Sequence, residues 1–424
     1  MKIAIFVDQF PVLSQTFVLN QVTALIDAGA NVTIIALNKP ESRKHHADVS
    51  QYQLISKTVY LLNEPSGKVN KLCYRIKNIL WAVVNKAKRS LILQSINKEY
   101  GKQGKSLLLA SILAKVEQPL EFDAIVCHFG YNGILANKLR QLGALNGNIV
   151  TVFHGYEVSA IKALALYKAE YQKLFKQTEL MLPISNLWRE KLIELGCAKE
   201  KVKVHRMGVN LANFPFVQKT NANNTDYLCN TQKNSHRAFK VFTVARFSEK
   251  KGIIYAINAM ALLPKSLNIQ YVLAGYGELE HEIKQQINQL NLSDNIVLLG
   301  KLDQKQVLAQ MHDCDIFLQP SVTARNGDME GVPVAIMEAM AVGLPVISTV
   351  HSGIPELIID GESGLLSPEK SAESLRDNIM KLYENSELRV AIVNNARKQI
   401  EQLADVNTLS VKLISLLEKL APRR

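Results

Sequence analysis

Apolar positions along this chain follow two alternating patterns. Short β-branched runs such as "KIAIFV" at 2–7 and "NVTIIAL" at 31–37 have the length and composition of buried strands. Between them, "TFVLNQVTALIDAG" at 16–29 places its apolar residues at helical spacing and ends in glycine. A strand, a helix and a strand in this order predict a parallel sheet covered by helices.

The alternation is interrupted once, at 213–237, a segment rich in Asn, Thr, Gln and Lys without periodicity. It resumes at "FKVFTVARF" and continues to "PVIST" at 345–349. Two successive α/β units of this kind predict two Rossmann-like, doubly wound domains that face a cleft. The expected parts are an N-terminal domain at 1–212, a connection at 213–237, a second domain at 238–390, and a helical stretch at 391–424 that packs back on the first domain.

One predicted helix has no polar face. In "EGVPVAIMEAMAVGLPV" at 330–346, Pro333 suits a helix start and Gly343 a helix end, so 334–342 should be a short helix. Its apolar residues cover the whole circumference, which indicates burial on most sides. Glu338 then has no solvated face, and a buried carboxylate is costly unless it is paired. We expect a dedicated partner for Glu338, either a structural cation or a ligand.

Composition narrows the class of protein. The chain has 424 residues, 47% hydrophobic and 21% charged, which is ordinary for a globular protein. It contains no apolar run of about 18 residues and no secretory signal pattern at its start, so we expect neither a transmembrane helix nor export. Five cysteines without CxxC spacing argue against zinc and disulfides and for a reducing, cytoplasmic compartment: Cys73, Cys127, Cys197, Cys229 and Cys314.

Positive charge is concentrated in the first half of the chain. Residues 1–206 carry 28 Lys and Arg against 15 Asp and Glu, whereas 207–424 carry 22 against 23. The segment 68–105 has ten cations and one acid, Glu99, and it includes apolar residues at helical spacing: Ile76, Leu80, Trp81, Val83 and Val84. We expect an anionic inner-membrane surface, and not nucleic acid, as the partner of this segment. The alternative is an ordinary core-facing helix with a solvated basic side.

Candidate chemistry lies where strands of the second domain end, because open parallel sheets bind ligands at that edge. The candidates are Arg246 and Lys251 after one strand, Gly275 and Gly277 after the next, Glu330 before the buried helix, and the N–H groups that open that helix at Val334, Ala335 and Ile336. Two cations, a glycine turn and a helix N-terminus in one crevice suit a diphosphate. Glu338 would lie about 7 Å deeper along the helix, where it could accept hydrogen bonds from a ribose. Glu330 would meet the other end of the ligand.

These residues carry a resemblance to a known family. Glu330 and Glu338 form the E-x7-E motif of the retaining glycosyltransferases of family 4, which have the GT-B fold, and "ARFSEKKG" resembles the family's R-x4-K-G. "AGYGELE" and "SGIPELIIDGESGLL" are also similar to recurring family segments. In the first half, "FPVLSQTFVLNQV", "CHFG", "TVFHGYEVS" and "HRMGVNLANF" resemble a bacterial subgroup that builds exopolysaccharides, including colanic-acid-type transferases.

The resemblance implies a role for each residue. Arg246 and Lys251 neutralise the diphosphate, Glu338 holds the ribose, Glu330 contacts the donor sugar, and His154 lies beside that sugar. Backbone near Leu299, Gly300 and Lys301 is expected to contact the base. The implied reaction moves a sugar, with retention, from a UDP- or GDP-sugar to a hydroxyl of a lipid-linked or growing surface glycan. No cofactor and no metal are expected.

Acceptor contacts are assigned to Ser14, Thr16 and His128, against helix capping for the first two and a structural histidine for the third. Two positions depart from the family, since Glu157 and Asn210 stand where relatives often have Asp. Alternative functions are a catalytically inert nucleotide-sugar-binding or scaffold protein, and a phosphorylase or sucrose-type synthase of the same fold. A dinucleotide-dependent oxidoreductase is disfavoured because no GxGxxG follows "KIAIFV".

Overall fold

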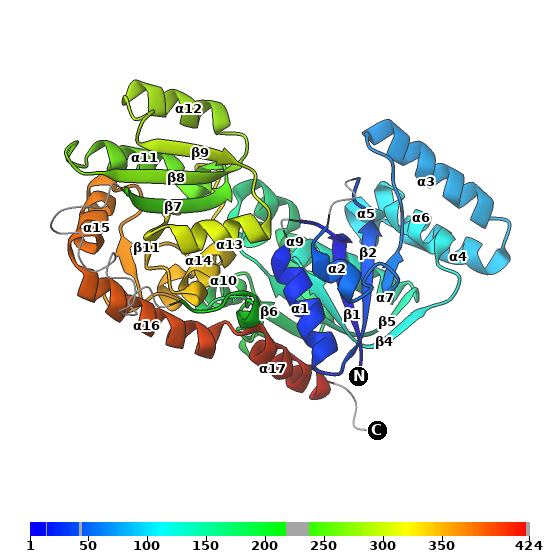
Figure 1. The fold of residues 1–424 in the computed structure, drawn as a ribbon. Helices are drawn as coiled ribbons and strands as arrows, with labels where there is room; N and C mark the ends of the chain where they lie inside the picture. Colours follow the sequence, from blue (N-terminus) through cyan, green and yellow to red (C-terminus); the bar gives the residue numbers. More distant parts are fainter. Residues whose placement is uncertain (14, 42–44, 218–236, 421–424) are drawn as a thin grey trace.

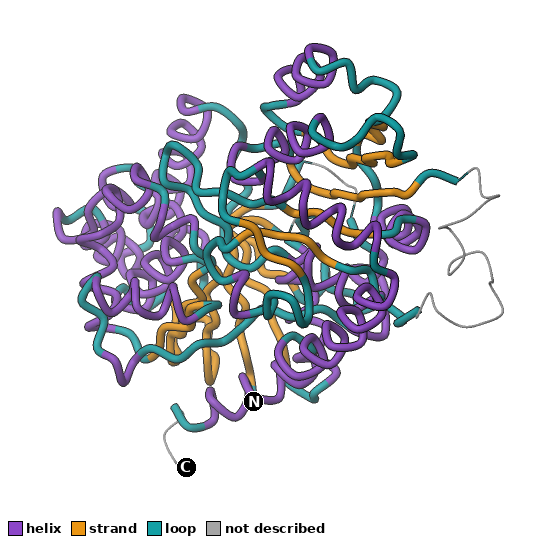
Figure 2. Tube along the Cα trace, turned by 90° about the vertical axis from the view of Figure 1, so that its left-hand side faces the viewer, coloured by secondary structure: helices purple, strands orange, loops and turns teal. Residues whose placement is uncertain are grey.

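The computed structural model describes residues 1–424 except 14, 42–44, 218–236 and 421–424. It contains two six-stranded parallel sheets, with strand orders β3-β2-β1-β4-β5-β6 and β12-β11-β10-β7-β8-β9, side by side in Figure 1. Figure 2 shows the strands of both sheets lying between helices. The predicted pair of doubly wound domains is confirmed.

The first sheet is built from the first half of the chain. Its strands are β1 (Lys2–Gln9), β2 (Asn31–Asn38), β3 (Thr58–Tyr60), β4 (Leu120–His128), β5 (Leu145–Phe153) and β6 (Leu180–Pro183). The helices are α1 (Thr16–Asp27), α2 (Ala47–Gln51), α3 (Lys68–Ala82), α4 (Lys86–Ser95), α5 (Gly101–Lys105), α6 (Leu108–Lys115), α7 (Gly130–Gln141), α8 (Tyr156–Ser159), α9 (Ile161–Gln177) and α10 (Asn186–Glu194). In the register of the sheet, Ile3 of β1 lies between Val32 of β2 and Ala124 of β4. This central position explains why β1 is apolar throughout its middle.

The second sheet follows the same plan. Its strands are β7 (Phe239–Arg246), β8 (Ile269–Tyr276), β9 (Ile296–Gly300), β10 (Ile316–Gln319), β11 (Val346–Thr349) and β12 (Leu365–Ser367). The helices are α11 (Ile253–Ala261), α12 (Glu280–Gln289), α13 (Gln304–Asp313), α14 (Val334–Val342), α15 (Ala372–Glu384), α16 (Ser386–Leu403) and α17 (Val406–Glu418). The carboxyl ends of β7, β8 and β10 face the first domain, which places the candidate residues in the space between the sheets.

The predicted C-terminal helical stretch is two helices that serve different domains. α16 packs against α14 of the second domain, whereas α17 packs against α1 of the first (Figure 1). The break comes at Asp405, whose carboxylate caps α17 by accepting from the N–H groups of Asn407 and Thr408. The return to the first domain is therefore confirmed, but it occurs near residue 404 and the expected boundary at 390/391 falls inside α16.

Two chain segments cross between the domains side by side. The Val209 N–H donates to the Ala404 carbonyl at 2.9 Å, and the Val406 N–H donates to the Val209 carbonyl at 3.1 Å. The first crossing is complete by Val217, whose N–H donates to the Val342 carbonyl at the end of α14 at 3.1 Å. Most of the connection predicted at 213–237 lies outside the described residues. Within the described parts of the chain, no helix is long and apolar enough to cross a membrane.

Candidate active site

α14 begins and ends where its sequence predicts. Pro333 is its N-cap residue, and Gly343 ends it in the left-handed conformation with φ 85°. Glu338 has one partly exposed edge, yet burial of its carboxyl group raises the pKa to about 7. Among the residues that the structure describes, none forms a hydrogen bond or an ion pair with Glu338. The structural cation considered as its partner is therefore absent among these residues, and a ligand as the partner stays a prediction.

The start of α14 offers fewer donors than the sequence suggested. The Ile336 N–H donates to the Pro333 carbonyl at 3.1 Å and is not available to an anion, which corrects its assignment to the phosphate site. Val334 and Ala335 are only partly buried, and no acceptor for their N–H groups is found among the described residues. Two backbone donors at the positive end of the helix remain for an anion.

Glu330 lies just before α14 and is 7% exposed. Its carboxylate forms an ion pair with Lys251, with 2.8 Å between Oε1 and Nζ, and the adjacent Lys250 pairs with Asp328 at 3.1 Å. Burial alone would raise the pKa of Glu330, but Lys251 and Lys250 together hold it below its usual value. Lys251, which the sequence assigned to the diphosphate, thus contacts the neighbouring acid in this structure, at the edge where the sugar is expected.

A second set of residues holds the Glu330 loop in place. The Glu330 N–H donates to His351 Nε2 at 3.0 Å, so the ring proton of a neutral His351 resides on Nδ1. His351 Nδ1 lies 2.5 Å from Oε1 of Glu369. The Glu369 carboxylate also accepts hydrogen bonds from the backbone N–H and the hydroxyl group of Thr323. Glu369 was not among the residues predicted for the site. Only its position in the fold connects it to Glu330, since the two are far apart along the chain.

Arg246 lies at the end of β7 with its side chain 73% exposed. Its guanidinium is 3.4 Å from the Glu278 carboxylate, the kind of surface contact that contributes little stability. Gly275 is the next-to-last residue of β8, and Gly277 follows the strand. Packing requires both glycines, because a Cβ added to Gly275 would lie 1.8 Å from the Ala245 carbonyl oxygen and one added to Gly277 would lie 2.4 Å from that of Phe247. Contact of these two glycines with a ligand stays a prediction.

The end of β9 contains the residues expected near the base. Gly300 has φ 66°, a conformation that glycine adopts without strain, and the side chain of Lys301 lies over the Tyr276 ring, 5.1 Å from its centroid. Leu299 packs against the apolar core. Contact of these residues with the base stays a prediction.

The first domain contributes a pair of histidines. His154 Nε2 lies 3.1 Å from His128 Nδ1, and the ring of His154 also contacts Phe17 and Phe129. Burial lowers the pKa of His128 to about 3, and burial together with His128 lowers the pKa of His154 well below its usual value. Both rings are neutral near pH 7. His128 is completely buried, which corrects its assignment to a direct acceptor contact: it contacts His154 instead.

Glu157 fixes the backbone at His154. Its Oε1 accepts from the His154 N–H at 2.9 Å, and burial raises the pKa of this carboxyl to about 7 despite its backbone hydrogen bonds and the charge of Lys250. The loop that carries Glu330 passes directly against this segment, because a Cβ added to Gly331 would lie 2.5 Å from the His154 carbonyl oxygen. The fold therefore brings His154 and Glu330 together from opposite domains, as the sequence predicted.

The remaining acceptor candidates are only partly placed. Ser14 lies outside the described residues, and Thr16 is the first residue of α1, whose N-cap is Gln15 without a side-chain capping bond. Asp8, near the carboxyl end of β1, was missed. It keeps solvent access, but partial burial raises its pKa and the charge of Lys71 offsets part of that rise. The strand-end rule applied to the second domain would have found it if applied to the first.

Metal ligands do not gather in this region. The described residues contain no group of three or more His, Cys, Asp or Glu side chains arranged to hold a metal ion. The expectation of a metal-independent reaction stays a prediction.

The sequence is also similar to those of known proteins. The family model for glycosyl transferases group 1 matches residues 230–399. The chain is 39% identical over 421 residues to the putative colanic acid biosynthesis glycosyltransferase WcaL of Salmonella typhimurium, and 42% identical over 424 residues to the amylovoran biosynthesis glycosyltransferase AmsK of Erwinia amylovora. Each match covers 99% of this chain and 100% of the relative. The chain belongs to the group 1 glycosyltransferases.

Solved structures agree with this glycosyltransferase in fold. Anabaena HepE, in complex with UDP and glucose, superimposes with a TM-score of 0.71 at 18% identity, covering 99% of this chain and 100% of HepE. Sucrose-phosphate synthase from Thermosynechococcus elongatus gives a TM-score of 0.71 at 17% identity, covering 99% of both chains. At these identities the likeness establishes the GT-B fold alone. The predicted fold and family are confirmed.

Proposed function

We propose that this glycosyltransferase moves a sugar, with retention and without a metal, from a UDP- or GDP-sugar to a hydroxyl of a lipid-linked or growing bacterial exopolysaccharide. The observation that carries the proposal is the carboxyl group of the partly exposed Glu338, which has no partner among the described residues, one and a half turns inside α14, with the Glu330–Lys251 pair just before that helix. A ribose that donates two hydroxyl hydrogen bonds would supply the missing partner of Glu338. The names of WcaL and AmsK support a role in exopolysaccharide synthesis.

Charge placement suits the departure of a nucleoside diphosphate. The breaking anomeric bond transfers negative charge to the β-phosphate, so donors already fixed in position stabilise the transition state. The Val334 and Ala335 N–H groups, Arg246 and Lys251 are those donors. Lys251 would then lie between the Glu330 carboxylate and the phosphate, and hold the acid that contacts the sugar. The leaving phosphate accepts the acceptor's proton on the same face, which accounts for retention without a carboxylate nucleophile.

The neutral histidines suit the sugar side of the cleft. A neutral His154 can hydrogen-bond a sugar hydroxyl without repelling the positive charge that develops at the anomeric carbon. His128 positions the ring of His154, and Glu157 positions the backbone of His154. Closure of the domains around the donor would exclude water and prevent hydrolysis.

For the surroundings of the enzyme, we propose a cytoplasmic location at the inner face of the membrane, where a lipid-linked acceptor would be found. The concentration of cations at 68–105 supports attachment to anionic lipid.

The second candidate is a nucleotide-sugar-binding protein without activity. The ion pair of Lys251 with Glu330 and the apposition of His154 to Gly331 favour an enzyme, because binding of a nucleotide alone would not require an ordered acid and histidine at the sugar end.

A ligand panel followed by product analysis tests the proposal. Thermal shifts with UDP, GDP and their sugars should identify one base by its stabilisation of the protein. The matching nucleotide sugar is then incubated with acceptor, with and without EDTA, and the anomeric configuration of the product is measured by NMR. Nucleotide binding with neither transfer nor hydrolysis would favour the inactive binding protein. An inverted product would disprove retention, and loss of activity in EDTA would disprove metal independence.

A further inference from the structure

Large apolar side chains gather on the surface of one segment. Among the residues that the structure describes, 21 large hydrophobic residues are exposed, and nine of these lie within residues 69–96. Six of the nine form a face along and just beyond α3: Val69, Leu72, Ile76, Leu80, Trp81 and Val84. Trp81 is 81% exposed and Val84 87%. An exposed apolar patch of this kind marks a binding surface. We call these six residues the α3 apolar face.

The inner side of α3 combines apolar and polar contacts. Tyr74, Ile79, Ala82 and Val83 pack against the core of the first domain. Beside them, Arg75 forms a two-point ion pair with Glu64 and donates to the Ser106 carbonyl at 2.7 Å, and Asn78 donates to Ser111 at 2.9 Å. These contacts hold the inner side of the helix against the domain, and the α3 apolar face lies on the other side. The core-facing alternative considered from the sequence therefore holds for Val83, which packs against the core, but not for Ile76, Leu80, Trp81 and Val84, which are exposed.

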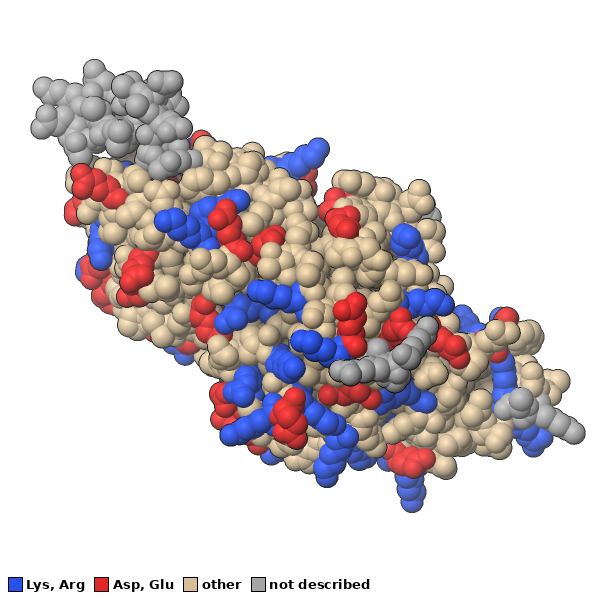
Figure 3. Space-filling view, turned by 90° about the horizontal axis from the view of Figure 1, so that it is seen from below, with Lys and Arg blue, Asp and Glu red and all other residues tan. Residues whose placement is uncertain are grey.

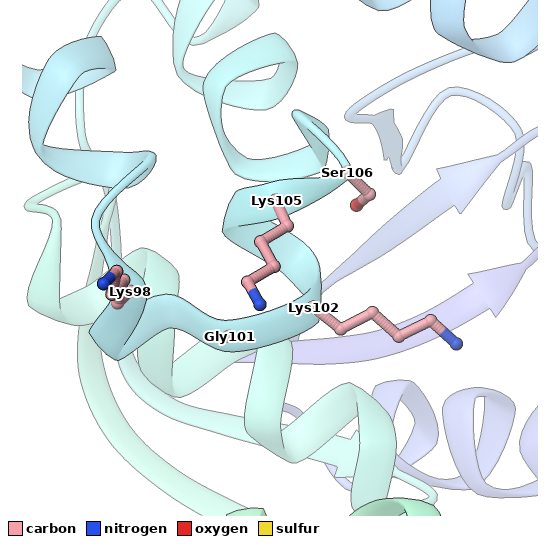
Figure 4. A pocket seen from close by; sticks show the side chains of 5 residues that line it. All are labelled: Lys98, Gly101, Lys102, Lys105 and Ser106. Carbon is pink, nitrogen blue, oxygen red and sulfur yellow. The ribbon is translucent and has the colours of Figure 1, made fainter.

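We propose that the α3 apolar face inserts into an anionic bilayer and holds the enzyme at the membrane. The charge around it selects this occupant. Lys68, Lys77 and Arg89 are exposed near the face, and Lys98, Lys102 and Lys105 line an open hollow beside α3 (Figure 4). Ser106, at the rim of this hollow, is the residue whose carbonyl accepts from Arg75. Anionic headgroups would neutralise these cations, whereas a second copy of the same basic surface would be repelled.

The face of the molecule seen from below has no comparable surface of positive charge alone. Figure 3 shows Lys and Arg side chains interleaved with Asp and Glu across both domains on that face. The sequence 68–105, by contrast, contains a single acid. Apolar area and unopposed positive charge thus coincide at α3.

The position of α3 also suits delivery of an acceptor. Its first turns lie at the carboxyl end of the first sheet, where Lys71 is close enough to influence the pKa of Asp8. The α3 apolar face therefore extends from the edge of the cleft to the outer end of the domain. This inference deepens the proposed function by assigning the membrane partner to residues, and it rests on that function for the acceptor but not for lipid binding.

The protein contains its own reporter for the test. It has two tryptophans, Trp81 in the exposed face and Trp188, which is 2% exposed. The full-length protein is mixed with vesicles of phosphatidylcholine, with or without phosphatidylglycerol, at low and high salt. We expect sedimentation with the anionic vesicles, weakened by salt, and a blue shift of the emission as Trp81 enters the bilayer interface.

Three variants separate insertion from other effects. Leu80→Ser/Trp81→Ser should reduce partitioning into anionic vesicles by roughly tenfold or more, because burial of one large apolar side chain is worth about that factor. Trp81→Phe should bind nearly as well as the wild type but without the blue shift. Val411→Ser changes a side chain that is 60% exposed on α17 and should leave binding unchanged.

The outcomes distinguish this inference from the proposed function. UDP and GDP binding, measured by calorimetry on every variant, reports on the donor site alone. Vesicle binding unchanged in Leu80→Ser/Trp81→Ser, an absent blue shift, or equal binding to neutral and anionic vesicles would overturn the inference. So would a concentration-dependent dimer that this double variant abolishes, since the occupant would then be a second copy. Normal vesicle binding without nucleotide binding would instead contradict only the proposed function.

Discussion

α14 and α3 are both rich in apolar residues, and both contain charge, but they are used in opposite ways. α14 is enclosed by the second domain, and its one charged residue, Glu338, has no partner among the described residues. α3 shows its apolar side to solvent, and its inward charge, Arg75, is fully engaged with Glu64 and Ser106. The contacts of Arg75 suit a structural role, whereas a charged group left without a protein partner, such as Glu338, is a candidate for contact with a ligand.

This contrast predicts that charge changes near α14 and charge changes under α3 have opposite effects. Near α14 they should reduce activity without lowering stability, because the charges act on a ligand. Under α3 they should reduce stability and spare the chemistry. The substitutions below test these expectations from the largest expected effect to the smallest, and the last compares an apolar position on each helix.

Arg246→Ala should lower the rate of sugar transfer by roughly 10²-fold or more, as loss of a fixed charge donor at a reacting centre typically does. Its exposed contact with Glu278 contributes little stability, so the melting temperature should stay near that of the wild type. The matched control is Lys284→Ala, which removes an exposed cation paired with Glu280 on α12. Transfer and thermal melting are measured on both. Wild-type turnover in Arg246→Ala would assign this residue to the solvated surface.

Glu338→Gln should weaken binding of the nucleoside diphosphate by about 1–3 kcal/mol, the range for a hydrogen bond to a charged group. Glu330→Gln should leave that binding nearly intact while it lowers turnover, because Glu330 is assigned to the sugar. Calorimetry with the free diphosphate, together with a transfer assay, measures both. Equal losses of nucleotide affinity in the two variants would contradict this division of roles.

Glu338→Gln should also change how the free energy of unfolding depends on pH. The pKa of Glu338 in the folded protein, about 7, lies well above the usual value for a glutamate carboxyl group, so its ionisation opposes folding. This penalty is absent below about pH 4.5, grows as pH rises towards 7, and is complete above it. Glu338→Gln should therefore raise the unfolding free energy of the ligand-free protein at pH 8 by about 1–2 kcal/mol, with no gain at pH 4.5. Denaturant titrations at the two pH values give the comparison, and a gain that does not change with pH would show that the pKa of Glu338 is the same in the folded and the unfolded protein.

Arg75→Met should lower the free energy of unfolding by about 1–2 kcal/mol, because it leaves Glu64, 3% exposed in its side chain, without a cation. Transfer to a water-soluble acceptor should continue at close to the wild-type rate. Urea unfolding and a transfer assay check the two halves. A stable but inactive variant would reverse the assignment and make Arg75 a functional residue.

Leu80→Ser should change the free energy of unfolding by less than about 0.5 kcal/mol, since the side chain is 68% exposed and packs little. The comparison is Ile336→Ser in α14, a fully buried position where loss of packing and burial of a hydroxyl should be severe. Similar destabilisation by both would mean that α3 is buried against something in solution even without lipid.

Much of the donor side could be predicted from sequence because its determinants are local. Pro333, Gly343 and an apolar run set the limits of α14, and the eight-residue separation of Glu330 and Glu338 follows from the helix itself. The strand-end rule then assigned Arg246 and Lys251 to one crevice, and the family resemblance added His154. Local patterns did not show that the Ile336 N–H is used by Pro333, or that His128 is buried beneath His154.

By itself, the sequence determined the two α/β domains, the family, and the segments that contain the chemistry, because strand and helix periods and short motifs are properties of neighbouring residues. Only the tertiary structure decided which charges meet. Lys251 contacts Glu330, and Glu369 supports the backbone of Glu330 through His351. Arg75 holds the inner side of α3 against the domain through contacts with Glu64 and Ser106. Each of these pairings joins residues from separate elements. Their distances therefore depend on how the sheets and helices pack, which no local pattern encodes.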